Sequence, residues 1–336
     1  MDILIIGGTG LVSGALVEHM VEQGHRITTY TRGRDHHRFV DAEPEVRKIH
    51  GDRNEHAQFA RQLGDEKYDV VIDTICYNAA DARADVEIFG GRCDRLIMIS
   101  TDFVYGTHAT HLPMHEDFPT KPVSKYGRNK LSAEEVFRQA QDQKKLDCVI
   151  VRSPHIYGPG APLGIGSIRG RNYQTADQIR GDHPVVILDD GIWCTQPIYN
   201  GDVARGVAAI IASEKTIGNI YHLAGPRVYR AYEYYQAIGK AVGAAPRFLS
   251  VPSSLYLRYF TRVAPYCFHR IYDCSRLVAD TGFQASVDID DAVMRTLDWQ
   301  HRSNKAQPYE PNKLEIALIA MLEYHLEQLT VLLRNP

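Results

Sequence analysis

The feature that most constrains the fold of this chain is its start, where an apolar strand, a glycine turn and a helix follow one another. Residues 2–6 read D-I-L-I-I, a short apolar run typical of a buried parallel strand. Gly7-Gly8-Thr9-Gly10 comes next, and the apolar positions after it recur at helical spacing. Ser13 stands where such turns usually carry a third glycine, and it is small enough to keep helix and strand close. The pattern predicts the first βα unit of a parallel sheet.

Strands and helices alternate through the first half of the chain. Alternation at this spacing predicts an α/β fold with a doubly wound parallel (Rossmann) sheet, a smaller mixed α/β substrate domain and a C-terminal helix. The predicted domains are 1–155 plus about 203–225 for dinucleotide binding, about 156–202 and 226–305 for the substrate, and 306–336 as a helical tail. Further strands are predicted at 26–30, 46–50, 68–75, 95–100, 147–151, 185–188 and 220–223.

The glycine turn has the context that a dinucleotide site requires. Glycines let the backbone approach a pyrophosphate, and the helix N-terminus offers free N–H groups and a positive dipole. The alternative is a βα turn that binds nothing. The residues predicted to contact the cofactor here are Gly7, Thr9, Gly10, Leu11 and Val12.

The end of the second predicted strand bears on which cofactor binds. NAD sites commonly carry Asp or Glu there, whereas this chain has Thr31-Arg32-Gly33-Arg34. Arg32 suits a 2′-phosphate, so the sequence favours NADP over NAD, unless these arginines are solvated loop cations. Asp52, after the third strand, is predicted to contact the adenine, or else to serve as a turn residue.

Tyr126 and Lys130 are four residues apart in S-K-Y-G-R-N-K, which on a helix places both side chains on one face. An ammonium beside a phenol favours the phenolate, so the tyrosine can exchange protons nearer neutral pH. Thr101 ends an apolar strand, where its hydroxyl could hold a reacting oxygen or cap its own turn. These three residues are the predicted catalytic group.

Composition excludes several classes of protein. A net charge of −3 gives no electrostatic reason to expect nucleic acid. The six cysteines form no C-x-x-C pair, which predicts free, buried thiols in a reducing compartment. We expect no signal peptide and no membrane partner, and therefore a cytoplasmic chain that binds a small-molecule substrate.

The tail has a helical pattern of its own. Asn312 and Glu315 form a capping-box arrangement ahead of an apolar stripe. That stripe must be buried, either on the body of the same chain, which is the favoured interpretation, or on a second copy in a homodimer. Its members are Ile319, Leu322, Leu326, Leu329 and Leu333.

Five segments in order resemble the extended short-chain dehydrogenases/reductases of the NAD-dependent epimerase/dehydratase family. They are G-G-T-G-L-V-S-G (7–14), S-T-D-F-V-Y-G (100–106), Y-G-R-N-K (126–130), R-S-P-H-I-Y-G-P-G (152–160) and G-D-V-A (201–204). The resemblance implies that Tyr126 is the acid/base, that Lys130 is its partner and also holds the nicotinamide ribose, and that Thr101 hydrogen-bonds the substrate oxygen.

Departures from the family pattern narrow the chemistry. Family dehydratases carry an Asp-Glu pair after the Thr, whereas here Asp102 is followed by Phe103, which has no proton to transfer. His155 replaces a common Asn, as a substrate contact or as a core histidine. Thr195 aligns with a phosphate-binding Arg, which weakens the case for a diphosphate-linked substrate. The candidate substrate contacts are Asp102, Phe103, His155 and Thr195, and the arginines that could replace the missing one are Arg169, Arg171 and Arg227.

One loop carries His108, His111 and His115 at a spacing that zinc could use. A rim of the active site or a solvated loop is the favoured interpretation, so no metal is predicted.

Two classes of function follow. The first is a nicotinamide-dependent epimerase or reductase, using NAD or NADP, that acts on a hydroxyl or carbonyl carbon of a sugar-like substrate, nucleotide-linked or free. The second is a non-catalytic NAD(P)-binding regulator or an RNA-binding relative, because the turn and Gly51-Asp52-Arg53 also resemble chloroplast stem-loop RNA-binding proteins. Such proteins often lose the Tyr or the Lys, and this chain keeps both.

Overall fold

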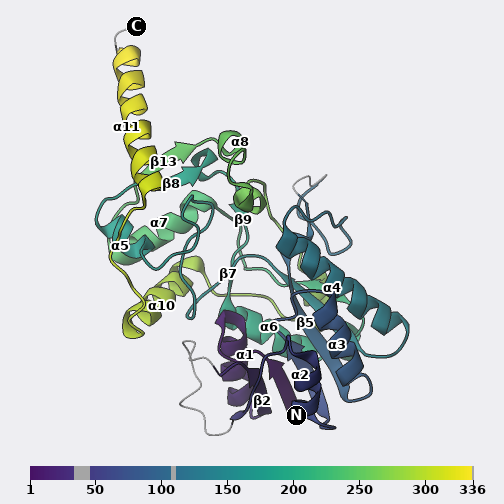
Figure 1. Ribbon diagram of the computed structural model, residues 1–336. Helices are drawn as coiled ribbons and strands as arrows, with labels where there is room; N and C mark the ends of the chain where they lie inside the picture. Colours follow the sequence, from purple (N-terminus) through teal and green to yellow (C-terminus); the bar gives the residue numbers. More distant parts are fainter. Residues whose placement is uncertain (34–45, 107–110, 335–336) are drawn as a thin grey trace. The chain divides into compact units, whose positions relative to one another are not determined.

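The computed structural model describes residues 1–33, 46–106 and 111–334 (Figure 1). The chain divides into two compact units. Unit 1 comprises residues 1–160, 196–228 and 270–287, and unit 2 comprises residues 161–195, 229–269 and 288–336. Residues 270–287, which the sequence pattern places in the substrate domain, fall in unit 1.

A seven-stranded parallel sheet forms the centre of unit 1, in the order β11-β6-β5-β4-β1-β2-β3. The order reverses between β1 and β4, and ligands of doubly wound sheets bind beyond the carboxyl ends of the strands at such a point. The predicted parallel sheet is therefore confirmed. Its strands are β1 (Asp2–Ile6), β2 (Arg26–Thr31), β3 (Val46–His50), β4 (Tyr68–Asp73), β5 (Cys93–Thr101), β6 (Cys148–Ser153) and β11 (Ile220–His222).

Helices cover both faces of this sheet. On one face Leu16 and Val207 belong to a buried apolar cluster beneath α1 and α6, and on the other Ala133 and Phe137 of α4 pack with Phe89 of α3. The helices of unit 1 are α1 (Leu11–Glu22), α2 (His56–Leu63), α3 (Ala79–Phe89), α4 (Lys125–Asp142), α6 (Asn200–Ile211) and α9 (Ser275–Thr281). Its minor elements are the 3-10 turns η1 (Asp102–Val104) and η3 (Glu214–Thr216) and the paired strands β7 (Ile156–Tyr157) and β10 (Ile198–Tyr199).

Unit 2 has two small sheets among helices. β8 pairs with β13 in parallel, and β9 pairs with β12 in antiparallel fashion. The strands are β8 (Val185–Leu188), β9 (Cys194–Thr195), β12 (Tyr229–Arg230) and β13 (Phe248–Val251), and the 3-10 turns are η2 (Asp189–Gly191) and η4 (Thr261–Tyr266). The helices are α5 (Thr175–Arg180), α7 (Ala231–Val242), α8 (Ser253–Tyr256), α10 (Ile289–Arg302) and α11 (Lys313–Arg334).

The C-terminal helix α11 begins where the capping pattern predicts, because Asn312 Oδ1 accepts from the Glu315 amide at 3.0 Å. Leu322 packs with the core of unit 2, but Leu326 and Leu333 are 52% and 81% exposed. Packing of the whole apolar stripe on the chain's own body is therefore wrong for its second half. By length and composition alone, α11 could cross a membrane.

All six cysteines are free thiols, as predicted. Their predicted burial holds only in part, because Cys76 and Cys148 are buried while the other four are partly exposed.

Candidate functional site

The glycine turn between β1 and α1 is held in a backbone shape that side chains would obstruct. Gly7 has φ +115° and Gly8 has φ +135°, in the left-handed half that favours glycine. A Cβ on Gly7 would lie 2.4 Å from Thr74 Oγ1, and one on Gly8 would lie 2.8 Å from the Thr29 side chain. The turn is thus built for close approach of the backbone to a ligand.

Ser13 explains how the turn works without a third glycine. Its hydroxyl accepts from the Gly10 amide at 3.0 Å, which fixes the first turn of α1. The Leu11 carbonyl accepts from Asn200 Nδ2 of α6 at 2.9 Å, so the start of α1 is also held from the neighbouring helix.

A cavity of about 230 Å³ opens beside this turn. It contains Gly7, Thr9, Gly10, Arg32 and Asp52 among its lining residues, so five of the predicted cofactor contacts lie around one space. The other predicted contacts in the turn, Leu11 and Val12, are outside this lining. The remaining lining residues are Ser13, Tyr30, Thr31, Gly51, Arg53, Asn54, Ile75 and Tyr77.

Arg53 lines this cavity, but only 3% of its surface is exposed. Its side chain is the centre of a buried ion cluster. Its guanidinium donates to Asp73 at 2.5 Å and to Asp85 at 2.6 Å. Burial alone would lower the pKa of Arg53, but the charges of the two carboxylates outweigh it and raise that pKa. Burial and the charge of Asp73 raise the pKa of Asp85 well above its ordinary value.

This cluster could be mistaken for a metal site. Ligand atoms of Asp73, Cys76 and Asp85 lie within 4.8 Å of one another, which is the one such group of three among residues 1–33, 46–106 and 111–334. The Arg53 guanidinium already binds both carboxylates, so the cation of this cluster is an organic one.

The helix that carries Tyr126 and Lys130 begins at a capped turn. Ser124 Oγ accepts from the Gly127 amide at 3.0 Å, an N-cap that satisfies one of the free donors of α4. A Cβ on Gly127 would lie 2.1 Å from the Phe103 carbonyl oxygen, so only glycine allows α4 to pack this tightly on the turn after Thr101.

Lys130 is buried beneath this packing, with 1% of its surface exposed. Its Nζ donates to the Cys76 carbonyl and to the Ile99 carbonyl, both at 2.7 Å. Two of its three donors are therefore used by loop and strand backbone. Burial lowers the pKa of Lys130 below its ordinary value, against the opposing charge of Asp73.

Tyr126 lies among aromatic rings at the surface of unit 1, where it is 43% exposed. Its ring centroid is 6.0 Å from that of Phe103 and 6.5 Å from that of Tyr77. Tyr77 lines the cavity beside the glycine turn, and the Lys130 ammonium lies 5.7 Å from the Tyr77 ring. Tyr77, which the sequence analysis did not single out, therefore connects the cavity to the predicted acid/base.

Thr101 and its neighbours end β5 close to these groups. Thr101 Oγ1 accepts from the Phe103 amide at 3.2 Å and lies 3.3 Å from Asp102 Oδ1. Asp102 is buried, and its Oδ2 accepts from Arg270 at 2.7 Å and from Tyr272 at 2.8 Å. Phe103 thus contacts both Thr101 and the Tyr126 ring, while Tyr77 contacts both Tyr126 and Lys130. Asp102 is engaged inside the protein.

The other candidate substrate contacts lie elsewhere. His155 is buried in unit 1, with its ring stacked at 6.3 Å on that of Tyr157, and Thr195 is buried in unit 2. Arg169 forms an ion pair with Glu315 of α11 within unit 2. His111 and His115 stack on each other at 5.7 Å, and His108 and Arg34 lie outside the described residues.

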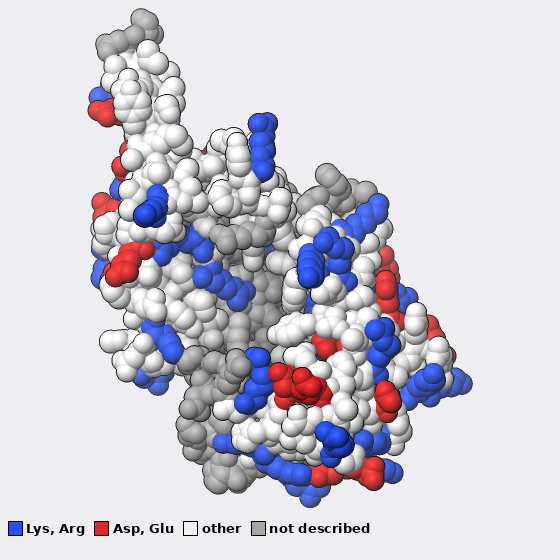
Figure 2. Space-filling view, viewed as in Figure 1, with Lys and Arg blue, Asp and Glu red and all other residues white. Residues whose placement is uncertain are grey.

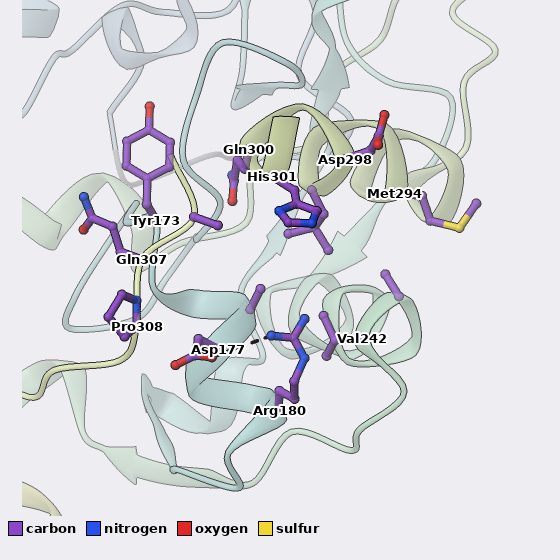
Figure 3. Close-up of a pocket in the computed structure, with 14 residues that line it drawn as sticks. Tyr173, Asp177, Arg180, Val242, Met294, Asp298, Gln300, His301, Gln307 and Pro308 are labelled. Atoms are coloured by element: carbon purple, nitrogen blue, oxygen red, sulfur yellow. Dashed lines mark ion pairs between the residues drawn. The ribbon is translucent and has the colours of Figure 1, made fainter. Parts of the chain in front are cut away.

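Unit 2 contains a separate cavity of about 610 Å³, lined by α5, α7, α10 and residues 306–308 (Figure 3). Arg180 faces Asp177 there, with 3.6 Å between nitrogen and oxygen. None of the site residues predicted from the sequence lines it.

A buried histidine at the end of β11, His222, makes stability depend on pH. His222 Nδ1 lies 3.1 Å from the Asp273 carbonyl, to which only an N–H can donate, and Nε2 lies 2.6 Å from the Tyr105 hydroxyl. With its proton on Nδ1, the neutral imidazole accepts from the Tyr105 hydroxyl through Nε2. Burial lowers the pKa of His222 from 6.5 to about 3.

We expect this histidine to lower the free energy of unfolding in acid. The unfolded chain takes up the proton below pH 6.5 while the folded chain does not until about pH 3. The contribution is therefore complete above pH 6.5 and falls by up to ~1.4 kcal/mol per pH unit below it. Urea titrations at pH 7 and pH 5 should show a smaller difference for His222→Gln than for the parent chain. Equal differences would contradict the assignment.

Comparisons with known proteins show which chains this one resembles. Residues 3–224 match the model of the NAD dependent epimerase/dehydratase family. Over 253 residues the chain is 29% identical to 2′-dehydrokanamycin reductase of Streptomyces kanamyceticus, covering 75% of this chain and 70% of that protein. It is 24% identical over 261 residues to the chloroplast stem-loop binding protein of 41 kDa b of Arabidopsis thaliana, covering 73% of this chain and 63% of that protein.

Solved structures show the same fold. UDP-glucose 4-epimerase of Thermotoga maritima, in a structure with UDP-glucose, aligns with a TM-score of 0.75 at 16% identity and covers 90% of this chain and 100% of that one. UDP-glucuronic acid 4-epimerase of Bacillus cereus, in complex with UDP-glucuronic acid and NAD, aligns at 0.73 and 19% identity, covering 90% and 99%. The chain therefore belongs to the NAD dependent epimerase/dehydratase family, within the extended short-chain dehydrogenases/reductases.

Proposed function

We propose that this chain is a nicotinamide-dependent reductase of a keto group on a sugar-like molecule, with Tyr126 as the acid. The main observation behind the proposal is that Tyr77 lines the cavity and also contacts the Tyr126 ring and the Lys130 ammonium. The resemblance to 2′-dehydrokanamycin reductase supports the reductive direction. Phe103 in place of a dehydratase Glu argues against elimination of water.

The lining of the cavity suits the adenosine and pyrophosphate end of a dinucleotide. Gly7 and Gly8 have positive φ angles and neighbours that leave no space for a Cβ, which holds the turn in shape, and the N-terminal amides of α1 suit a pyrophosphate. Arg32 would hold a 2′-phosphate and Asp52 the adenine, while Lys130 would hold the ribose next to the nicotinamide. When bound, the nicotinamide supplies or accepts a hydride.

The chain's own residues would then supply the proton that the reduced carbonyl oxygen needs. The Thr101 hydroxyl holds the substrate oxygen, and the Tyr126 phenol gives that oxygen a proton as the carbonyl becomes an alcohol. The buried Lys130 ammonium has a third N–H beyond the two that backbone carbonyls accept, and its positive charge stabilises the phenolate that remains.

The test is the reaction itself, assayed with reduced NADP and a panel of keto-sugars, free and nucleotide-linked. We expect oxidation of reduced NADP coupled to formation of the sugar alcohol, with cofactor that exchanges freely. Purified chain that retains NAD and interconverts sugar epimers without net oxidation would replace the reductase with an epimerase, the second reaction that this site supports.

A non-catalytic role is the second class of function, favoured by the likeness to the chloroplast stem-loop binding protein. Against it stand the net charge of −3 and the retained Tyr126 and Lys130. Tight, salt-dependent binding of a stem-loop RNA, with no turnover of any keto-sugar, would favour this role.

Replacement of Arg32 tests the cofactor preference. We expect Arg32→Ala to weaken NADP about 10–100-fold, the loss of one charge-assisted hydrogen bond, and to leave NAD nearly unchanged. Calorimetric titration of both cofactors measures this, with Arg47→Ala on β3 as the control because Arg47 pairs with Glu66 at the surface. An equal loss for both cofactors, or none, would remove the 2′-phosphate assignment.

A further inference from the structure

The second half of α11 presents apolar side chains with no cover from unit 2. Its first half is anchored, because Glu315 is fully buried against Arg169, and Ile319 and Leu322 pack with the core of unit 2. Glu323 is the last anchor of this half, paired with Arg247 at 2.7 Å. Beyond it the helix projects from the rest of the unit (Figure 1), and its surface there is mostly uncharged (Figure 2).

The exposed part is strongly apolar. Leu326 is 52% exposed, Leu329 54%, Leu332 66% and Leu333 81%. Soluble proteins rarely leave such a continuous patch in water unless it is an interaction site. The sequence pattern alone required burial of this stripe, and unit 2 supplies that burial only up to Leu322.

The stripe repeats with the period of a coiled coil. Ile319, Leu322, Leu326, Leu329 and Leu333 alternate at spacings of three and four, which are the a and d positions of successive heptads. Glu323, Glu327 and Arg334 lie together on one flank of that seam, about 100° around the helix from it. A seam bordered by charges on one side is typical of pairing between helices.

A membrane is a poorer occupant. Although α11 has the composition of a membrane span, its first half is fixed to unit 2 by Glu315 and Glu323. Residues 324–334 alone reach about 16 Å as a helix, roughly half of the hydrocarbon thickness of a bilayer.

We propose that the occupant is a second copy of this chain, with the two α11 helices paired in antiparallel orientation. In this register Leu326 packs opposite the partner's Leu329, and Leu322 opposite the partner's Leu333. Each contact between two seam positions therefore occurs twice, once with each copy supplying the first residue. A two-fold interface requires this self-complementarity.

Charge and space favour the antiparallel orientation. It brings Arg334 of one copy level with the acidic flank of the other, near Glu323 and Glu327, and it opposes the two helix dipoles favourably. A parallel pair would place the charged flanks of the two copies on opposite sides of the seam, where Arg334 meets no carboxylate of the other copy. The antiparallel pair also holds the two bodies at opposite ends, because each body covers only the first half of its own helix.

The size of the seam sets the expected strength. The uncovered segment, residues 324–334, is about one and a half heptads long, so the seam buries on the order of 1,000 Å² over both copies, near the lower limit for a specific interface. Association should therefore depend on protein concentration rather than be permanent.

Sedimentation equilibrium of the full chain tests the proposal. We expect Leu326→Glu/Leu329→Glu to halve the particle mass, towards the single-chain value of 37.9 kDa if this is the sole interface. Met321→Glu is the matched control, because Met321 is 49% exposed on α11 but lies off the seam, and it should leave the mass unchanged. An unchanged mass in the double variant would overturn the proposal.

A cross-linking experiment tests the orientation. Mild oxidation of a mixture of Leu326→Cys and Leu329→Cys chains should give the mixed disulfide in excess over either self-linked species. Preferential self-linking of Leu326→Cys would overturn the antiparallel arrangement. Flotation with phosphatidylglycerol vesicles, weakened as much by Met321→Glu as by the seam variant, would assign the apolar surface to a membrane and overturn the proposal as a whole.

Discussion

Replacing Tyr126 with Phe should lower kcat about 10²–10⁴-fold and leave cofactor affinity almost unchanged. The substitution removes one hydroxyl and keeps the ring that contacts Phe103 and Tyr77, so the packing at the start of α4 is preserved. The cavity beside the glycine turn is lined by other residues, which is why binding should survive. Steady-state kinetics with reduced NADP and calorimetric binding measure the two effects separately.

The control for this variant is Tyr259→Phe in unit 2, where the tyrosine is 75% exposed. It should behave as the parent chain in both measurements. Turnover that persists in Tyr126→Phe at the parent rate would show that another group supplies the proton.

Replacing Arg53 with Met should lower the free energy of unfolding by about 3–5 kcal/mol, because it leaves buried carboxylates without their counter-ion. Arg53 donates to both Asp73 and Asp85, and all three side chains are at most 3% exposed. The cluster ties the loop after β3 to β4 and α3, so cofactor affinity should also fall. Urea unfolding followed by circular dichroism measures the first effect.

Two comparison variants make this result specific. Asp85→Asn should cost less, because Arg53 keeps its ion pair with Asp73 and the amide retains an oxygen that can accept from the guanidinium. Arg61→Met on the exposed face of α2 should change stability by no more than about 0.5 kcal/mol. A loss for Arg53→Met as small as that for Arg61→Met would contradict the role of the cluster.

The sheet of unit 1 was predictable because its strands are apolar runs of the right length separated by helical patterns. The predicted bounds of β1, β3 and β8 coincide with those observed, and β5 and β6 differ at their ends. Strand ends depend on which backbone groups find partners, and β5 runs on to Thr101 because Thr101 pairs with Ser153 of β6. Periodicity carries no information about such pairing.

Site residues that belong to a local sequence motif were predictable. Site residues that the fold brings in from distant segments were missed. The glycine turn, Tyr126 and Lys130 each lie in a local pattern. Tyr77 follows β4 in a stretch without a recognisable motif, and its position beside the cavity depends on the fold. Arg53 gave one signal, its place directly after Asp52, but a sequence does not show that an arginine is buried between two aspartates.

The tail shows the limit of periodicity most clearly. The stripe on α11 predicts a surface that requires cover, but spacing cannot say what covers it. The answer depends on how far the body of unit 2 extends along the helix, and in the structure it extends only to about Glu323.

The most direct test of the account is calorimetric titration of the purified chain, freed of bound nucleotide, with NADP and with NAD. We expect saturable binding of one dinucleotide per chain, with NADP the tighter of the two. Absence of binding by either would contradict it, because the cavity, Lys130 and Tyr126 would then have no hydride carrier to serve.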